Sequence, residues 1–331
     1  MTTAALALPV TDPGLEARLR DRMTAVEARL EAAVHSEAPF VTEAARHLLR
    51  AGGKRFRPLL VLLAAEVADS SDNEDVLTAA CVVELTHLAS LYHDDVMDEA
   101  DLRRGTPSAN ARWDNHVAIL AGDWLFSKSS ELTSRLGPEA VRIQAVTFSR
   151  LVEGQMLETL GPGDGDALAH YLRVVQGKTG SLIATSARYG SLFAGASPEV
   201  VTALTAYGEK VGIAFQLADD ILDIASDSDE SGKTPGTDLR EGVSTLPVLM
   251  AMASNDPADD RLKELLGSDL TDDDLHAEAL ELMRQHPAME QAREYVRGLA
   301  TEAHTLLGPV PEGDVRDALT AFADVIASRT H

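Results

Sequence analysis

The chain has 331 residues, of which 45% are hydrophobic and 25% charged, a composition typical of a soluble globular protein with a sizeable core. Acidic residues outnumber basic ones by 53 to 29, and the resulting net charge of −24 argues against binding to nucleic acids or anionic membranes. The single cysteine, Cys81, excludes an internal disulfide or a thiolate metal site, and its apolar neighbours indicate a core position.

The sequence shows neither a targeting signal nor a membrane span. Residues 1–13 lack the basic start and apolar stretch of a signal peptide, and we expect a flexible leader there, followed by one all-helical domain over 14–331. The most apolar runs, such as Leu59 to Ala65, are too short to cross a bilayer. These features and the single cysteine favour a cytoplasmic location.

Apolar residues recur three or four positions apart through most of the chain, which is the period of an amphipathic helix. Aromatic residues make up only 4% of the sequence, so small and aliphatic side chains must build the core, which also favours helices. We find no strand-like alternation and no Asn-Gly hairpin turn. The sequence therefore predicts an all-α protein with helices over about 15–34, 40–51, 56–68, 75–100, 116–136, 138–160, 167–194, 198–226, 244–254, 274–285, 288–307 and 312–328.

The pattern Asp-Asp-x-x-Asp occurs twice, at 94–98 and 219–223, each time beside apolar residues of a predicted helix. The first and last aspartates of each copy lie one helical turn apart and project from the same face. Carboxylates without nearby His or Cys suit a hard cation such as Mg²⁺, which keeps waters and shares substrate phosphates. The candidate metal ligands are Asp94, Asp95, Asp98, Asp219, Asp220 and Asp223. In contrast, we interpret Asp272-Asp273-Asp274 as a solvated helix face.

Basic residues next to glycines supply candidate contacts to an anion. Gly52-Gly53-Lys54-Arg55-Phe56-Arg57-Pro58 places three cations at a glycine turn that opens a helix, where a diphosphate can be held. Arg103-Arg104-Gly105 follows the first aspartate motif, and Lys178-Thr179-Gly180 and Gly232-Lys233-Thr234 add further donors. Each cluster alone is typical of solvated surface, but in so acidic a chain the set predicts a phosphate site.

In order and spacing, these motifs resemble the trans-polyprenyl diphosphate synthases over about residues 40–250. The resemblance also includes His87, seven residues before Asp94, together with Gly122-Asp123 and Phe215-Gln216. It implies one bundle of about 10–13 helices around a deep central cavity, usually in a homodimer. It further implies three Mg²⁺ ions per active site, for which Mn²⁺ can substitute.

The resemblance assigns roles to individual side chains. Isopentenyl diphosphate would be held by Lys54, Arg57, His87 and Arg104. The allylic diphosphate would be held by Arg103, Lys178, Thr179, Gln216 and Lys233. The three metal ions would be ligated by Asp94, Asp98 and Asp219, which with Lys178 and Arg103 form the catalytic set. Without the resemblance, His87 would be interpreted as a core histidine, and Thr179 and Gln216 as ordinary helix residues.

The implied reaction is the head-to-tail condensation of isopentenyl diphosphate with an allylic diphosphate, farnesyl or geranylgeranyl, without a nucleophilic side chain. One departure concerns the segment Asp238 to Gly242, which related enzymes commonly follow with a lysine. Here Val243 takes that position, so either Arg240 or Lys233 compensates, or the substrate is held more weakly.

Small side chains before the first motif predict a long product. Ala89 and Ser90 lie one turn nearer the cavity floor than Asp94, where short-chain members place bulky residues. Deeper positions are not aromatic either: Thr86, Leu85 and Val82. This resembles the long-chain synthases, heptaprenyl to decaprenyl, whose all-trans products become the side chains of quinones such as menaquinone. It remains open whether Ala89 is simply a core alanine and another helix sets the floor.

Four alternatives stay open at this stage. The chain is a short-chain, geranylgeranyl-forming synthase if the chain-length argument fails. A class I terpene cyclase would normally lack the second Asp-Asp-x-x-Asp and the second diphosphate site. A non-catalytic partner subunit of a two-component synthase would usually lack both motifs, and a helical scaffold protein would need neither. None of these interpretations includes a nucleic-acid partner or integral membrane association, although transient membrane contact on product release fits a long product.

Overall fold

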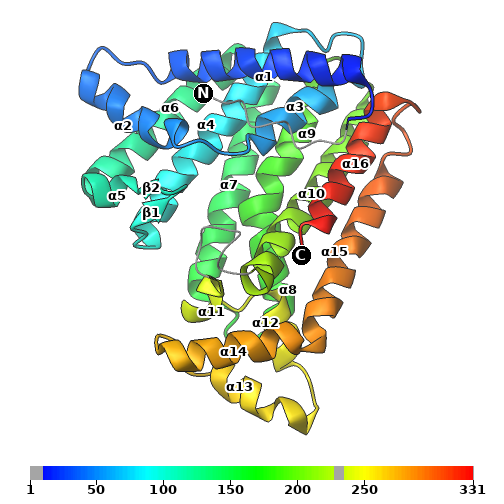
Figure 1. The fold of residues 1–331 in the computed structure, drawn as a ribbon. Helices are drawn as coiled ribbons and strands as arrows, with labels where there is room; N and C mark the ends of the chain where they lie inside the picture. The colour runs from blue at the N-terminus through cyan, green and yellow to red at the C-terminus, as the bar shows by residue number, and fades with distance from the viewer. Residues whose placement is uncertain (1–9, 227–234, 331) are drawn as a thin grey trace. The chain divides into compact units, whose positions relative to one another are not determined.

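The computed structural model describes residues 10–226 and 235–330, which are almost entirely helical (Figure 1). The all-α prediction is confirmed. The α-helices are α1 (Pro13–Ala33), α2 (Pro39–Arg50), α3 (Phe56–Ala65), α4 (Glu74–Met97), α5 (Ala109–Arg112), α6 (Asn115–Arg135), α7 (Pro138–Leu160), α8 (Ala167–Val175), α9 (Ser181–Phe193), α10 (Pro198–Ala225), α11 (Thr237–Arg240), α12 (Leu246–Met252), α13 (Asp260–Leu266), α14 (Asp273–Gln285), α15 (Pro287–Leu306) and α16 (Asp314–Ser328). A π-helix, η1 (Gln176–Gly180), joins α8 to α9, and a 3₁₀ turn, η2 (Pro257–Asp259), precedes α13.

Each predicted helix is present, with boundaries that differ by a few residues. The helix expected over 167–194 is interrupted by η1, and the single-turn segments α5 and α11 and the short α13 were not predicted. The described residues therefore hold sixteen α-helical segments, more than the 10–13 expected. Segments of one or two turns show too little of the 3.6-residue period to stand out in a sequence.

The structure contains one short hairpin that was not predicted. Strand β1 (Leu102–Arg103) pairs antiparallel with β2 (Thr106–Pro107), and Arg103 lies opposite Thr106. The two residues between the strands, Arg104 and Gly105, both have positive φ, 54° and 73°, as a type I′ turn requires. Arginine is unusual in this conformation, so the turn lacks the Asn-Gly signature.

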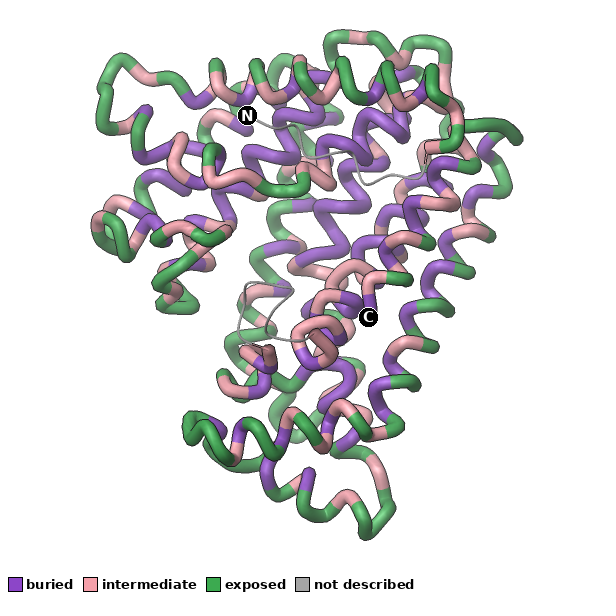
Figure 2. Tube along the Cα trace, in the orientation of Figure 1, coloured by how far each residue is buried: buried purple, intermediate pink, exposed green. Residues whose placement is uncertain are grey.

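The chain divides into two compact units. The first comprises the chain up to Phe148 with Leu182–Gly208 and Leu307–Leu319. Its central helix is α4, of which 15 of 24 residues are buried, and which packs against α6, α3 and α1 (Figure 2). Cys81 lies on this helix as predicted, and burial raises the pKa of its thiol to about 12. By length and composition α4 could span a membrane, but 72% of that stretch is buried, as in a core helix.

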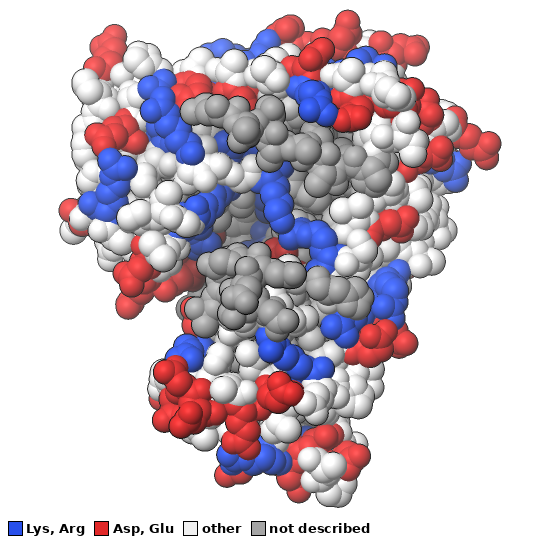
Figure 3. All heavy atoms as spheres, viewed as in Figure 1, with Lys and Arg blue, Asp and Glu red and all other residues white. Residues whose placement is uncertain are grey.

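The second unit comprises Ser149–Ser181, Glu209–Leu306 and the chain from Thr320. Its short apolar helix α12 is largely buried and packs against α15, α8, α13 and α14. Acidic side chains gather over α14 (Figure 3). Asp272 caps that helix by accepting hydrogen bonds from the amides of Asp274 and Leu275, and all three aspartates of this run are exposed, which confirms the solvated helix face. The expectation of a single domain over 14–331 stays a prediction.

Candidate active site

The first aspartate motif closes α4 and turns its middle carboxylate inward. Asp95 is fully buried, whereas Asp94 is half-buried and Asp98 is exposed. Arg103 donates from Nε to Asp95 Oδ1 at 2.6 Å, and the second oxygen, Oδ2, has no hydrogen-bond partner in the described structure. Burial raises the pKa of Asp95, and the Arg103 charge opposes that rise. The outer two aspartates are therefore the more accessible of the predicted ligands, and Asp95 fixes an arginine that was predicted to hold the allylic diphosphate.

The hairpin that carries Arg103 and Arg104 is attached to α2 and the glycine loop behind it. Arg104 donates to the carbonyl oxygens of Leu48, at 3.1 Å, and Gly52, while His47 contacts the carbonyl of Pro107 at 2.7 Å. Gly53 has φ of 133°, which favours glycine, and a β-carbon there would lie 2.8 Å from Cζ of Arg104. The structure thus brings together two segments that were predicted to bind isopentenyl diphosphate.

Arg55 has a structural role that the sequence did not reveal. It adopts a left-handed conformation with φ of 46°, and its guanidinium binds Glu84 at 2.9 Å and Glu27 at 2.5 Å. A further bond joins it to the carbonyl of Leu49 at 2.8 Å. Arg55 is thus used to hold the loop, whereas its neighbour Lys54 is exposed.

His87, on α4, is held neutral by its surroundings. Its pKa is lowered well below 6.5 by burial and then by the positive charges of Arg57 and Arg104. A neutral imidazole can donate or accept one hydrogen bond at each nitrogen, as contact with a diphosphate oxygen requires. Three of the four residues predicted to hold isopentenyl diphosphate, His87, Arg57 and Arg104, are therefore close enough to interact electrostatically.

The lowered pKa of His87 predicts a pH effect on stability. Below about pH 6.5, His87 is protonated in the unfolded chain but stays neutral in the folded protein. Protonation therefore favours the unfolded state, and this group lowers the free energy of unfolding by up to about 1.4 kcal/mol for each pH unit. Urea unfolding of the wild type and His87→Gln at pH 7.5 and 5.5 should show a smaller loss for the variant. Equal losses in both proteins would contradict the prediction.

The second aspartate motif, on α10, has the same inward middle residue. Asp220 is 5% exposed and accepts hydrogen bonds from the Tyr171 hydroxyl and from Gln216 Nε2, the latter at 3.0 Å. Burial is the main cause that raises the pKa of Asp220 to about 6. Asp219 is half-exposed and forms an ion pair with Arg329 at 2.9 Å, and Asp223 accepts from the amide of Asp238 at 3.0 Å.

Lys178 and Thr179 lie in the π-helix η1, a distortion that often marks functional sites. The backbone of η1 passes so close to α7 that a β-carbon on Gly154 would lie 2.4 Å from the amide nitrogen of Lys178. Thr179 donates to Gln216 Oε1 at 3.0 Å, and Lys178 forms an ion pair with Glu158 at 2.5 Å. Within the second unit, the structure thus brings Thr179 and Gln216 into contact.

Two residues were expected to compensate for Val243. Arg240 donates to the carbonyl of Thr271 and forms an ion pair with Asp273 at 2.8 Å, so it is engaged at the start of α14. Lys233 lies outside the described residues. Val243 itself is 41% exposed.

The carboxylates of both motifs fit a divalent cation that is shared with substrate. Across residues 10–226 and 235–330, no cluster of three or more His, Cys, Asp or Glu side chains could hold a metal ion by itself. An ion at either motif would need water and phosphate oxygens to complete its shell, which is how proteins usually bind Mg²⁺. The oxygen-only donors and the accessible outer aspartates agree with that chemistry.

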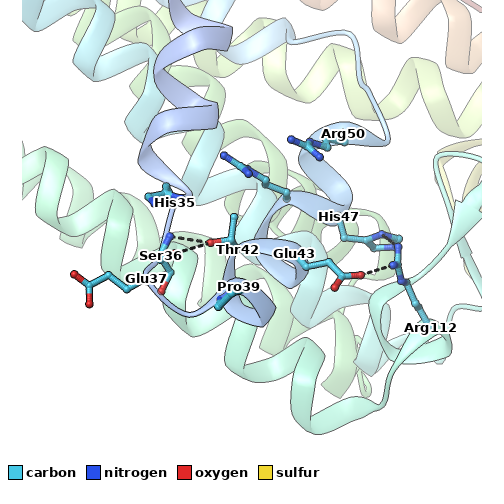
Figure 4. Close-up of a pocket in the computed structure, with 10 residues that line it drawn as sticks. His35, Ser36, Glu37, Pro39, Thr42, Glu43, His47, Arg50 and Arg112 are labelled. Atoms are coloured by element: carbon cyan, nitrogen blue, oxygen red, sulfur yellow. Dashed lines mark hydrogen bonds and ion pairs between the residues drawn. The ribbon is translucent and has the colours of Figure 1, made fainter.

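A cavity of about 670 Å³ lies in the first unit and is lined in part by α2 (Figure 4). Its charged groups are largely matched: Arg112 binds Glu43 at 2.6 Å, and Arg46 and Arg50 share Glu31. The residues that line it are His35, Ser36, Glu37, Pro39, Thr42, Glu43, Arg46, His47, Arg50 and Arg112.

Three side chains that shape the site were not predicted: Arg55, Tyr171 and Arg329. Arg55 belongs to the basic segment 52–58, where it was grouped with the cations that could bind a diphosphate. The one hint of its structural role was Glu84, an acidic residue in a predicted buried helix that needs a cation as partner. Tyr171 and Arg329 carry no local signal, because their aspartate partners are 49 and 110 residues away in sequence.

Comparison with known proteins places these features in a family. The Polyprenyl synthetase family model matches residues 38–283. Nonaprenyl diphosphate synthase of Mycobacterium tuberculosis is 47% identical over 328 residues, 99% of this chain and 98% of that protein. The structure of Corynebacterium glutamicum geranylgeranyl pyrophosphate synthase, complexed with calcium and isoprenyl diphosphate, is 46% identical with a TM-score of 0.87, and the match covers 96% of this chain and 98% of that one. Decaprenyl diphosphate synthase of Rhodobacter capsulatus is 36% identical, with a TM-score of 0.87 and the same coverage. The chain belongs to the polyprenyl synthetase family and is a prenyltransferase, as its ordered motifs predicted.

Proposed function

We propose that this enzyme condenses isopentenyl diphosphate head-to-tail with farnesyl or geranylgeranyl diphosphate to give a long-chain, all-trans polyprenyl diphosphate. The observation that carries the proposal is that two arginines, Arg57 and Arg104, place their positive charges near His87. His87 lies on α4, the helix that also bears the first aspartate motif. A cyclase acts on one diphosphate and has no need for this second anion site. A synthase that joins two diphosphates needs both.

Mg²⁺ is the cofactor that best fits the donor set, with three ions as the family resemblance implies. We assign its ligands to the accessible outer aspartates Asp94, Asp98 and Asp219. The similar protein from Corynebacterium glutamicum, with bound calcium and isoprenyl diphosphate, supports a divalent cation here. When bound, the metal would supply positive charge that stabilises the departing diphosphate.

The protein's own side chains bind and orient the two substrates. Arg103, held by buried Asp95, presents a fixed guanidinium to the allylic diphosphate, which stabilises the charge that develops as its C–O bond breaks. Lys178 adds a second cation once it leaves Glu158. Lys54, Arg57, Arg104 and neutral His87 hold isopentenyl diphosphate so that its double bond reaches the allylic carbon. The proton lost in forming the new alkene goes to the released diphosphate.

The long product is supported by small residues and by the named relatives. Ala89 is fully buried on α4, five residues before Asp94, and no bulky side chain stands there. The similar proteins include a nonaprenyl and a decaprenyl synthase. A geranylgeranyl synthase is similar to a comparable degree, so the short-chain enzyme is the second candidate.

Enlarging Ala89 should shorten the product. In the graded series Ala89→Val, Ala89→Leu and Ala89→Phe, each larger side chain should block the growing prenyl tail earlier, because it reaches further below Asp94. We expect the largest variant to stop at about three or four isoprene units, measured by chromatography after dephosphorylation. An unchanged product distribution in folded variants would show that another helix sets the length.

Several wider features belong to the same proposal. Exposed apolar side chains on α6, Ile119 and Leu120, and on α7, Val141 and Val146, are suited to a homodimer interface. We further propose a cytoplasmic enzyme whose product supplies quinone side chains such as that of menaquinone, with transient membrane contact as the product leaves.

The test is incubation of the purified chain with Mg²⁺, labelled isopentenyl diphosphate and farnesyl or geranylgeranyl diphosphate. A ladder that ends at about seven to ten units supports the full proposal. Products of three or four isoprene units would support the proposed reaction but contradict the proposed long product. Cyclic hydrocarbons would indicate a cyclase, and absence of incorporation by the folded chain would indicate a partner subunit.

A further inference from the structure

Asp220 is a buried carboxylate with only neutral hydrogen-bond donors around it. Its first-motif counterpart, Asp95, has an arginine, whereas Asp220 is met by the Tyr171 hydroxyl and by Gln216 Nε2 at 3.0 Å. Burying a carboxylate is costly unless each oxygen finds a donor. One donor here serves each oxygen, Tyr171 on Oδ2 and Gln216 on Oδ1, so the position of Asp220 is determined from two sides.

The carboxylate also fixes which way the Gln216 amide faces. A carboxylate accepts hydrogen bonds, so the group that meets Asp220 must be the amide nitrogen of Gln216. Its oxygen then faces Thr179, whose hydroxyl donates to Gln216 Oε1 at 3.0 Å. The amide nitrogen has a second N–H, and this donor remains to be offered to a diphosphate oxygen. In the same arrangement, the Thr179 proton is already used by Gln216.

Tyr171 anchors this network to the rest of the second unit. It lies on α8, which continues directly into η1 with Lys178 and Thr179. The segment from α8 to η1 is therefore tied to α10 at two points, through Tyr171 to Asp220 and through Thr179 to Gln216.

We propose that Tyr171 is a positioning residue for the allylic diphosphate: its hydroxyl holds Asp220, which orients the Gln216 amide toward the substrate. In this assignment Asp220 serves Gln216 and is not a metal ligand, which leaves metal binding in the second motif to the outer aspartates. The inference rests on the proposed function, because it concerns the allylic site of that reaction.

The matched variant Tyr171→Phe keeps the ring and removes only the donor. We expect the KM for farnesyl diphosphate to rise about tenfold, since a bond to a charged acceptor is lost, while the KM for isopentenyl diphosphate stays within about twofold. Tyr189→Phe is the control, because the Tyr189 hydroxyl donates to the carbonyl of Ala140 at 2.7 Å, outside the site. Tyr189→Phe should lower stability without changing either KM.

A double-variant cycle tests whether Tyr171 acts through Gln216. If it does, Tyr171→Phe added to Gln216→Ala should change the farnesyl diphosphate KM by less than about twofold further. Independent, multiplying effects of the two substitutions would overturn the proposal, as would a Tyr171→Phe enzyme with an unchanged farnesyl diphosphate KM.

Asp220→Asn provides a second test if Tyr171→Phe does not fold. It keeps the size of the side chain but leaves one acceptor oxygen for the two donors, Tyr171 and Gln216, so the farnesyl diphosphate KM should rise while the Mg²⁺ concentration at half-maximal rate stays unchanged. A higher Mg²⁺ requirement would show that Asp220 is a metal ligand and would reject the inference. Weaker binding of farnesyl diphosphate can also be measured without turnover, by calorimetry with its thiolo analogue in the presence of Mg²⁺. A wild type that binds this analogue but forms no product would reject the proposed function alone, and the network would then be tested by analogue affinity.

Discussion

Asp94→Ala and Asp219→Ala should each reduce turnover by about a thousandfold or more while the protein stays folded. Both carboxylates are partly exposed, so their removal opens no cavity in the core. What is lost is the charge that holds a divalent cation against the departing diphosphate, and stabilisation of this kind is often the largest single contribution to catalysis. Thermal unfolding and circular dichroism should match the wild type.

The control is Asp75→Ala, an exposed aspartate in the first turn of the same helix α4. It should keep wild-type turnover and lose only a small helix-dipole interaction. The Mg²⁺ concentration at half-maximal rate distinguishes metal binding from other defects, and it should rise in the residual activity of both motif variants. Turnover within tenfold of the wild type in either variant would remove that aspartate from the metal site.

Arg55→Met should lower the free energy of unfolding by about 3 kcal/mol. The side chains of Arg55 and Glu84 are 9% and 2% exposed, and loss of the arginine leaves a buried carboxylate without its cation. The glycine loop before α3 would also lose the bond to Leu49 that holds it. Urea unfolding monitored by circular dichroism measures the loss.

Two comparisons isolate the cause. Arg135→Met breaks the ion pair with Glu131, whose side chains are 63% and 49% exposed, and should cost less than about 1 kcal/mol. Combining Arg55→Met with Glu84→Met should recover most of the lost stability, because the unpaired buried charge is then gone. If the double variant were as unstable as Arg55→Met, the loss would come from the loop contacts rather than from the charge.

Long helices and the aspartate motifs were predictable because both are local patterns. The period of apolar residues determines α1, α4 or α10 over five or more turns, whereas α13 has seven residues and lacks that span. The inward rotation of the middle aspartates also had a signal. Asp95 continues the buried positions Leu88 and Tyr92 at helical spacing, so it belongs to the core face of α4.

Long-range partners were not predictable from one sequence. The hydroxyl of Tyr171 meets Asp220, and the guanidinium of Arg329 lies over the ring of Phe215 and binds Asp219. Such pairs depend on how helices that are distant in the chain pack together. The spacing of apolar residues in the sequence predicts the helices but does not indicate which of them are in contact. The type I′ turn at Arg104 was missed for a different reason, because a left-handed arginine contradicts the statistics on which turn prediction depends.

The buried thiol of Cys81 makes this chain a convenient subject for spectroscopy. Burial raises its pKa to about 12, so very little of the thiol is ionised at neutral pH, and the thiolate is the form that reacts with maleimides. The native cysteine therefore need not be replaced before labelling. A single new cysteine on an exposed position, such as Asp75, would take a fluorophore selectively, and its emission could follow substrate binding in the otherwise unmodified enzyme.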